Sequence, residues 1–342
     1  MALRFMDGCE HLVTADLGEK YEGLSGATVS TAQKRTGSAS LAGGYGAWVA
    51  KSIAASGSVA VIGFGIYNGG SYEPVVIVNR GGWNSSSYGQ VSLVVTTSGQ
   101  IQVKRARWNH WESALLGSTG PGVVRQGTWA YVEWKVTIND STGAYEVRVN
   151  GETVLTGTSK DTQYVSGDSG WDAVEFVVNL YNYIDDIYVC DGSGGVNDDF
   201  LGQCRVLTLL PSTGNGSNTD FTPSTGSDHG ALVDEAAPND DTDYVSSGTV
   251  GHVDTWHFPA VGYTGVIKGV QLALSAKKTD SDPRSIAAVT RPVSTNQIHG
   301  TAHALSTSYL YYLSMWEVNP EDSAAWEVAD VDGAEFGVKV AA

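Results

Sequence analysis

Paired carboxylates are the first chemistry to look for in this chain, because two acidic residues on one strand face can hydrolyse a glycosidic bond. A retaining mechanism needs the carboxyl groups about 5 Å apart, which alternate positions of one strand provide. Asp172 and Glu175 are three positions apart, so a strand sends them to opposite faces, and Glu133 has no acidic neighbour at a suitable spacing. We therefore expect the protein to have no hydrolase activity. If it were an enzyme, a glycan hydrolase would be the catalytic alternative.

A serine nucleophile is the second candidate chemistry. Gly167-Asp-Ser-Gly170 is similar to the nucleophile loop of trypsin-like serine proteases. The next residue is Trp171 instead of Gly, and the Thr-Ala-His triplet at 301–303 follows the serine rather than preceding it. We expect this segment to be a turn between strands, and the protein not to be an enzyme.

Oxygen-rich loops are the third candidate, because hard cations such as calcium bind carboxylate and amide oxygens. The richest loop offers Asn239, Asp240, Asp241 and Asp243 as metal ligands. The competing interpretation is a turn whose Asn and Asp side chains cap their own backbone. No cofactor is expected, with calcium as the one candidate ion.

Aromatic side chains beside amides are typical of carbohydrate sites, where flat apolar faces and hydrogen-bonding groups contact a sugar. Two short segments combine them, and the candidate binding residues are Trp83, Asn84, Tyr88, Trp108 and Trp111. Aromatic residues of sandwiches also fill cores and subunit interfaces, so packing remains the alternative interpretation.

Charge limits the partners. The 342 residues include 37 acidic and 20 basic ones, for a net charge of −17, which disfavours nucleic acid and anionic lipid. The sequence has no run of about 18 apolar residues and no apolar signal segment near Met1, so we expect no membrane insertion.

Cys9 and Cys190 are predicted to be ordinary buried thiols, with a disulfide between them as the alternative.

These candidate residues lie among predicted strands. Apolar and polar residues alternate from Trp129 to Ile138 and again from Tyr145 to Val149. Asn150-Gly151 then supplies the positive φ angles of a two-residue hairpin, so the second strand should pair with 153–155. Asn319-Pro-Glu-Asp322 predicts one short helix over 321–329.

This strand pattern resembles the concanavalin A-like and laminin G-like family, in which a strand ends in Val-Asn-Gly and the next begins Glu-x-Val. The segments at 5–8, 37–41 and 183–189 fit the same family, so the resemblance covers about residues 1 to 193. It implies a jelly-roll sandwich.

The second half is similar to the region that follows such a domain in bacteriophage virion proteins. The matching segments are Cys190-Asp-Gly-Ser-Gly194 and Asn197-Asp-Asp-Phe-Leu-Gly202, with further matches at 206–211, 256–258, 325–326 and 335–339. We therefore predict an all-β chain with three parts: a lectin-like sandwich at 1–193, a linker at 194–204 and a smaller β-sandwich at 205–342.

The resemblance implies a structural component of a phage virion, made in the host cytoplasm and exposed on the tail or the capsid exterior. Its expected partners are other virion proteins, further copies of itself, with a trimer favoured, and a host surface glycan. A stand-alone carbohydrate-binding module is the alternative function.

Overall fold

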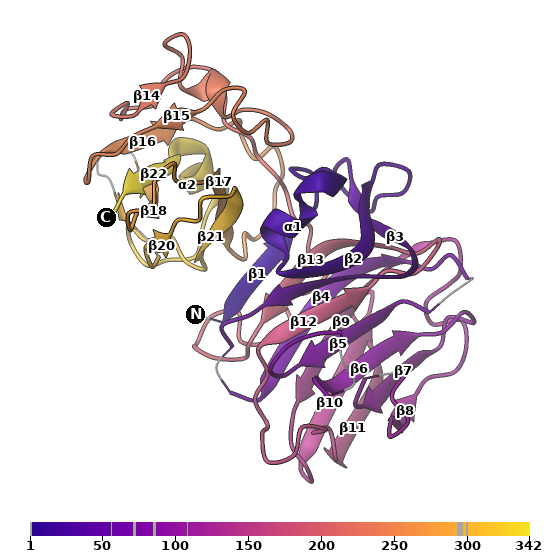
Figure 1. Cartoon of the computed structure of the whole chain (residues 1–342). Coiled ribbons are helices and arrows are strands. Elements are labelled where there is room, and N and C mark those ends of the chain that lie inside the picture. Colours follow the sequence, from indigo (N-terminus) through magenta and orange to yellow (C-terminus); the bar gives the residue numbers. More distant parts are fainter. Residues whose placement is uncertain are drawn as a thin grey trace. The chain divides into compact units, whose positions relative to one another are not determined.

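The computed structural model describes residues 2–342 apart from 56, 71–72, 85–86, 108, 293–296 and 299, with only the backbone given at 297–298. The chain forms two compact units, Met1–Val206 and Leu207–Ala342 (Figure 1). Strands dominate both units, which confirms the all-β fold class expected from the sequence.

The described part of the first unit contains thirteen strands, a 3-10 turn and a short α-helix. The strands are labelled in Figure 1. Their bounds are β1 Leu3–Asp7, η1 Thr14–Asp16, α1 Leu17–Lys20, β2 Gly23–Ser30, β3 Ser40–Ser52, β4 Val59–Tyr67, β5 Val75–Asn79, β6 Gly89–Val95, β7 Ile101–Arg105, β8 Ala114–Ser118, β9 Trp129–Thr137, β10 Gly143–Val149, β11 Glu152–Lys160, β12 Ala173–Val177 and β13 Tyr183–Cys190.

These strands make a two-layered β-sandwich. One layer has the order β11-β10-β9-β4-β13-β1, and the other has the order β2-β3-β12-β5-β6-β7-β8. The only pairing between β13 and β3 is at Ile184 and Leu41, so this single position joins the hydrogen-bonded paths of the two layers. The sandwich predicted from the strand pattern is confirmed.

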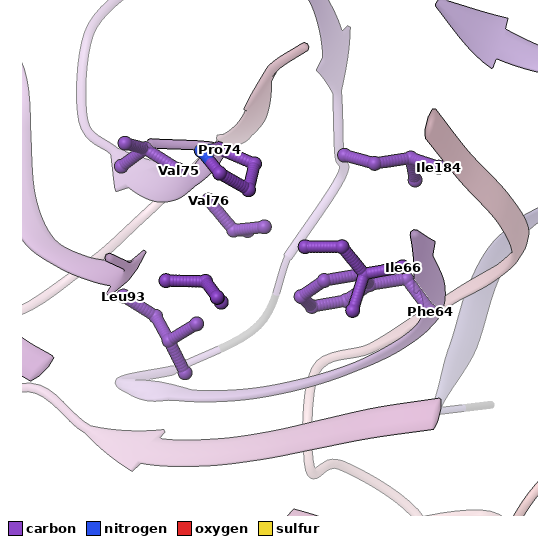
Figure 2. A pocket seen from close by; sticks show the side chains of 8 residues that line it. Phe64, Ile66, Pro74, Val75, Val76, Leu93 and Ile184 are labelled. Carbon is purple, nitrogen blue, oxygen red and sulfur yellow. The ribbon is translucent and has the colours of Figure 1, made fainter. Parts of the chain in front are cut away.

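Alternating apolar residues fill the space between the layers. Phe64 of β4 meets Phe176 of β12 edge to face, with ring centroids 6.1 Å apart. Figure 2 shows Ile66, Val76 and Leu93 around a small gap beside Phe64. All eight side chains that line the gap are apolar and it is too small to admit water, so it is a packing gap of the core.

The predicted hairpin forms at the predicted residues. Asn150 has φ of 51° and Gly151 has φ of 87°, and Val149 pairs with Glu152 across the turn. The pairing continues through Val147 and Leu155. Two consecutive positive φ angles match the twist of the flanking strands, which is why Asn-Gly specifies this turn.

The outer face of the β4-β9-β13 layer is covered by chain that follows the last strand. Glu133 is buried, and its Oε1 accepts a hydrogen bond from Tyr188 Oη at 2.6 Å and another from Gly202 N at 2.8 Å. Gly63 lies under the Tyr188 ring, where any Cβ atom would collide with it. The buried carboxylate thus fastens residues after 199 to the sandwich.

A second buried carboxylate continues this attachment. Asp186 accepts hydrogen bonds from Val206 N at 2.8 Å and from Thr36 Oγ1 at 2.7 Å, and it pairs with the Arg35 guanidinium. Arg35 also donates to the carbonyl of Cys204 at 2.7 Å. The end of the segment predicted as a linker at 194–204 is therefore bonded to the first unit.

The cysteines form no disulfide among the described residues. Cys9, Cys190 and Cys204 all keep their thiol groups, and the first two are buried. The disulfide weighed as an alternative does not form, and the prediction of ordinary buried thiols holds for Cys9 and Cys190.

The second unit is a smaller β-sandwich. Its elements are β14 Thr222–Pro223, η2 Gly230–Leu232, β15 Val245–Ser246, β16 Val253–Trp256, β17 Val270–Ala276, β18 Ser285–Arg291, β19 Gln297–Ile298, β20 His303–Ala304, β21 Leu310–Trp316, α2 Val328–Gly333 and β22 Glu335–Val340. The sheet β16-β22-β18-β19, to which β20 adds, is accompanied by the β17-β21 ribbon. Leu272 and Leu274 of the ribbon pack into the core around Phe336 and Trp256.

The predicted helix over 321–329 is wrong. The helix α2 spans Val328–Gly333 instead. Asn319 Oδ1 accepts from Glu321 N at 3.0 Å, and Ser323 N donates to Asn319 O while Ser323 has φ of 61°. A left-handed residue cannot continue a helix, so the Asn-Pro signal produces a turn that ends before the helix starts.

Candidate functional site

Three loops of the first unit meet beside strands β6 and β7. They are the β5–β6 connection after Asn79, the turn between β7 and β8 at 106–113, and the segment at 161–172 that follows β11. Hydrogen bonds between these loops, and from Gln90 of β6, hold them together.

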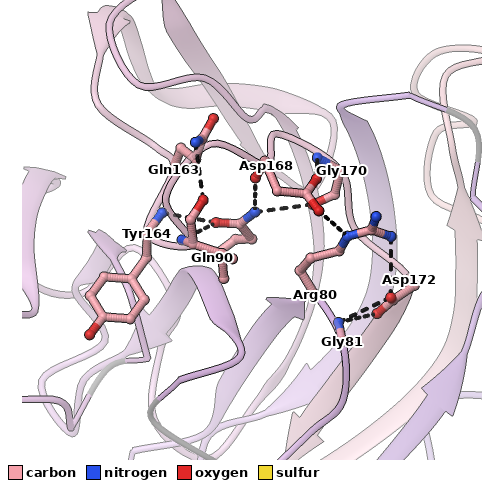
Figure 3. Close-up of polar contacts among 9 residues, drawn as sticks. Arg80, Gly81, Gln90, Gln163, Tyr164, Asp168, Gly170 and Asp172 are labelled. Atoms are coloured by element: carbon pink, nitrogen blue, oxygen red, sulfur yellow. Dashed lines mark hydrogen bonds and ion pairs between the residues drawn. The ribbon is translucent and has the colours of Figure 1, made fainter.

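Gln90 organises the 161–172 segment (Figure 3). Its side chain is fully buried, and Nε2 donates to the carbonyls of Asp168 at 2.6 Å and Gly170 at 3.1 Å. Oε1 accepts from the backbone N–H groups of Tyr164 at 2.9 Å and Val165 at 2.8 Å. One amide thus satisfies four backbone groups and fixes the path of the loop.

Arg80 closes the same loop from the other side (Figure 3). Its Nε donates to Asp168 Oδ2 at 2.7 Å and Nη1 to Asp172 Oδ2 at 3.3 Å, and Asp172 also accepts from Gly81 N. The Arg80 guanidinium and the Gly170 N–H lower the pKa of the Asp168 carboxyl. Asp172, weighed as a catalytic acid, therefore anchors the β5–β6 loop, and 167–170 forms a turn as expected.

Beside this scaffold, three rings form a continuous contact that we call the Trp111 row. Trp111 has 84% of its surface exposed, and its ring centroid is 5.5 Å from that of His110. The His110 ring in turn meets Tyr164 edge to face at 5.0 Å. In Figure 3 the Tyr164 ring points away from Gln90, which holds its backbone. The row therefore combines a solvent-exposed platform with a fixed base.

Polar groups flank the Trp111 row. Tyr164 Oη donates to Glu112 Oε2 at 2.9 Å and lies 3.4 Å from His110 Nε2. Burial and the Glu112 hydrogen bond raise the pKa of the Tyr164 phenol, so it stays a neutral donor. Arg105 pairs with Asp161 at 2.8 Å below the ring of Tyr164. Donors, acceptors and an exposed ring are thus close together, which is what a sugar requires.

The structure separates the residues that the sequence predicted to bind carbohydrate. Trp111 belongs to the row, and Trp108 lies outside the described residues. Trp83 is half-buried, because it packs over the cluster that contains Trp48. Tyr88 is 37% exposed and lies against Gly82. The Trp83 ring is therefore a packing group in the β5–β6 loop, as the alternative interpretation expected.

Asn84 has a structural partner as well. Its N–H donates to Glu175 Oε2 at 3.0 Å. Glu175 is fully buried in β12 and receives two hydrogen bonds from the Arg107 guanidinium, at 2.7 and 2.6 Å. This buried pair joins the start of the 106–113 turn to the sheet and to the loop carrying Asn84.

Sequence reasoning missed Tyr164, His110 and Glu112. His110 and Glu112 flank Trp111, so their adjacency to an aromatic residue was a usable signal. Tyr164 lies in a different loop, and nothing in its own sequence context indicates the contact.

The predicted calcium ligands form a network without a metal centre. Asp241 pairs with Lys277 at 2.6 Å and accepts from Tyr309 Oη at 3.1 Å. Asn239 donates to Asp243, and Asp240 has a left-handed φ of 57°. Across the described ranges, no group of three or more His, Cys, Asp or Glu side chains is placed to hold a metal ion. The loop closes as a turn through the backbone bond from Thr242 N to Asn239 O. The side-chain bonds of Asn239 and Asp241 run to other side chains, so neither the metal site nor the backbone cap weighed from the sequence is seen there.

No protein-family model matches this chain, and neither does any curated protein sequence. Among solved structures, the chain is similar to the CBM40 of the Ruminococcus gnavus IT-sialidase, with 16% identity over 41% of this chain and 79% of that one and a TM-score of 0.29. It is also similar to the carbohydrate-binding module CBM66 from Bacillus subtilis, with 10% identity, 48% and 95% coverage and a TM-score of 0.32.

A third similar structure is the alginate lyase Aly36B, with 13% identity, 54% and 95% coverage and a TM-score of 0.36.

Among the described residues, none of the helices has the length and apolar character needed to cross a membrane.

Proposed function

We propose that the first unit binds carbohydrate through the Trp111 row. The observation that carries the proposal is a tryptophan that is 84% exposed and continues through His110 to Tyr164, whose loop Gln90 fixes. Exposure of an apolar ring to water is unfavourable, so covering it with a ligand is favourable. A rigid platform also loses little conformational entropy on binding. Glu112 and the Tyr164 phenol supply hydrogen bonds for hydroxyl groups.

The test is an array of immobilised oligosaccharides probed with the full chain and with Trp111→Ala. We expect the wild type to bind at least one glycan and the variant to lose about tenfold or more in affinity, equivalent to about 1.4 kcal/mol. Leu115→Ala is the matched control, because Leu115 is also exposed near this turn but is not aromatic. Equal binding by wild type and Trp111→Ala refutes the proposal.

We further propose that this binding serves attachment of a phage virion to its host. Support comes from the resemblance of 190–194 and 197–202 to virion proteins. The segment after 199 lies folded onto the sandwich, so it is an ordered part of the chain. The proposal places the protein on the tail or capsid exterior as a homo-oligomer, with a trimer favoured.

Copy number decides between this role and a stand-alone carbohydrate-binding module. Quantitative mass spectrometry of purified virions from the phage that carries the gene should find many copies per particle. A protein that binds glycans as a monomer but is absent from particles supports the stand-alone module instead.

A further inference from the structure

A second group of aromatic residues crosses the other layer of the first unit. Trp129, Tyr67 and Tyr183 are register partners on the adjacent strands β9, β4 and β13. The ring centroids of Tyr67 and Trp129 are 5.9 Å apart, and those of Tyr67 and Tyr183 are 5.8 Å apart, with edge-to-face orientations. We call these three side chains the aromatic ladder.

The ladder is on the outer face of its layer. Phe64 points into the core, so Tyr67, three positions later on β4, points away from it. All three ladder residues are half-buried. Further along the same face, the Arg35 guanidinium covers the Tyr131 ring at 4.4 Å, and that residue is 1% exposed. The covering segments therefore stop short of the ladder.

The polar tips of the ladder contrast with those of five tyrosines of this unit that hydrogen-bond within it. Within the part of the chain that the structure describes, the two phenol hydroxyls and the Trp129 indole N–H have no hydrogen-bond partner in the protein, and none is a buried unpaired atom. They therefore reach solvent. Five other tyrosines donate to acceptors within the unit: Tyr21, Tyr131, Tyr145, Tyr164 and Tyr188.

The size of the ladder fits a saccharide chain. Three strands about 4.8 Å apart make the ladder about 10 Å long. A strip of this length is small beside the area of about 800 Å² that a stable protein interface needs on each partner. The ladder offers ring surface and solvent-reaching donors but no charged group of its own. Because the protein carries a net charge of −17, a neutral glycan fits better than an anionic one.

We propose that the aromatic ladder is a second carbohydrate-contact surface, which takes a neutral oligosaccharide. It goes beyond the Trp111 row, because the row lies at β7 and β8 of one layer and the ladder lies on β4, β9 and β13 of the other. One chain would then present two separate sugar contacts, and such multivalency raises avidity for a glycan surface without new contacts at either site.

The experiment titrates the full chain carrying 5-fluorotryptophan with maltohexaose, cellohexaose, laminarihexaose and chitohexaose, in a Trp111→Ala background. Fluorine NMR follows the resonance assigned to Trp129 by its loss in Trp129→Phe. We expect at least one sugar to shift this resonance saturably, and Trp129→Ala to weaken that binding by about tenfold or more, measured by calorimetry. Tyr67→Phe keeps the ring packing and should weaken binding less.

The outcomes separate the two sites. Binding that survives Trp111→Ala and is lost in Trp129→Ala supports the ladder even where the row binds nothing, and loss in Trp111→Ala alone supports only the row. The ladder proposal is overturned if the Trp129 resonance stays fixed with all four sugars. It is also overturned if that resonance moves on dilution of the protein without sugar, because the ladder is then a contact between copies.

Discussion

Removing the charge of Glu175 tests how the first unit holds its loops. The side chain is in the middle of β12, where its register partners Ala50 and Ile77 are buried and apolar. Both of its oxygens are used, by the Arg107 guanidinium and the Asn84 N–H. Glu175→Gln keeps the shape but leaves the Arg107 charge, which is 7% exposed, without its counter-ion.

The expected loss follows from the burial of this pair. Breaking a buried ion pair by neutralising one partner destabilises a protein by about 3–5 kcal/mol. For a unit of this length, 1 kcal/mol corresponds to about 2–4 °C in midpoint temperature, so Glu175→Gln should melt about 6–20 °C below wild type. A pair that is only half-buried, such as Arg148 with Glu146, should change stability by about 1 kcal/mol or less when broken.

Differential scanning calorimetry of the full chain measures this loss, since the two units can unfold in separate transitions. The double variant Glu175→Leu with Arg107→Met should recover most of the lost stability, because Ala50 and Ile77, the register partners of Glu175, belong to an apolar cluster. A drop below about 2 °C in Glu175→Gln contradicts the reasoning. So does a double variant that is no more stable than the single one.

Two further predictions concern the outer face of the β4-β9-β13 layer. A fragment ending at residue 193 loses the donors Gly202 N to Glu133 and Val206 N to Asp186, so it should melt below a fragment ending at residue 206; equal melting temperatures would show that the attachment adds nothing. Burial and the adjacent Asp186 raise the pKa of Asp185 to about 7. An acid whose pKa is raised in the folded state stabilises that state at pH values below its unfolded pKa, and this contribution is lost as the pH rises to the folded pKa. The stability contributed by Asp185 should therefore fall between about pH 4 and pH 7. Asp185→Asn should remove that part of the pH dependence of the unfolding free energy, and a carboxyl ¹³C titration with a midpoint near 4 would contradict it.

Local signals in the sequence predicted the strands and the hairpin well. Alternation from Trp129 to Ile138 identified β9, and Asn150-Gly151 identified the turn between β10 and β11, because both depend on neighbouring residues only. The helix prediction also used neighbouring residues only, and it failed. Asn319 and Ser323 form a turn, and the left-handed conformation of Ser323 stops helix growth.

Contacts between distant segments could not be derived from the sequence. Alternation predicts Tyr131 and Glu133 on an outer, mixed face, yet each is 1% exposed because residues 35 and 202 return to cover them. The same reason applies to the candidate site. Trp83 and Trp111 are both loop tryptophans in the sequence, and only the packed loops decide that one covers the sheet.

The amino-acid sequence therefore determined which residues form strands, where the hairpin turns and which aromatic residues are neighbours along the chain. Tertiary structure alone decided that Tyr164 completes the Trp111 row and that Trp129, Tyr67 and Tyr183 align across three strands. The physical reason is that strand pairing and loop packing bring together residues separated by many positions, whereas propensity and periodicity depend on neighbours only.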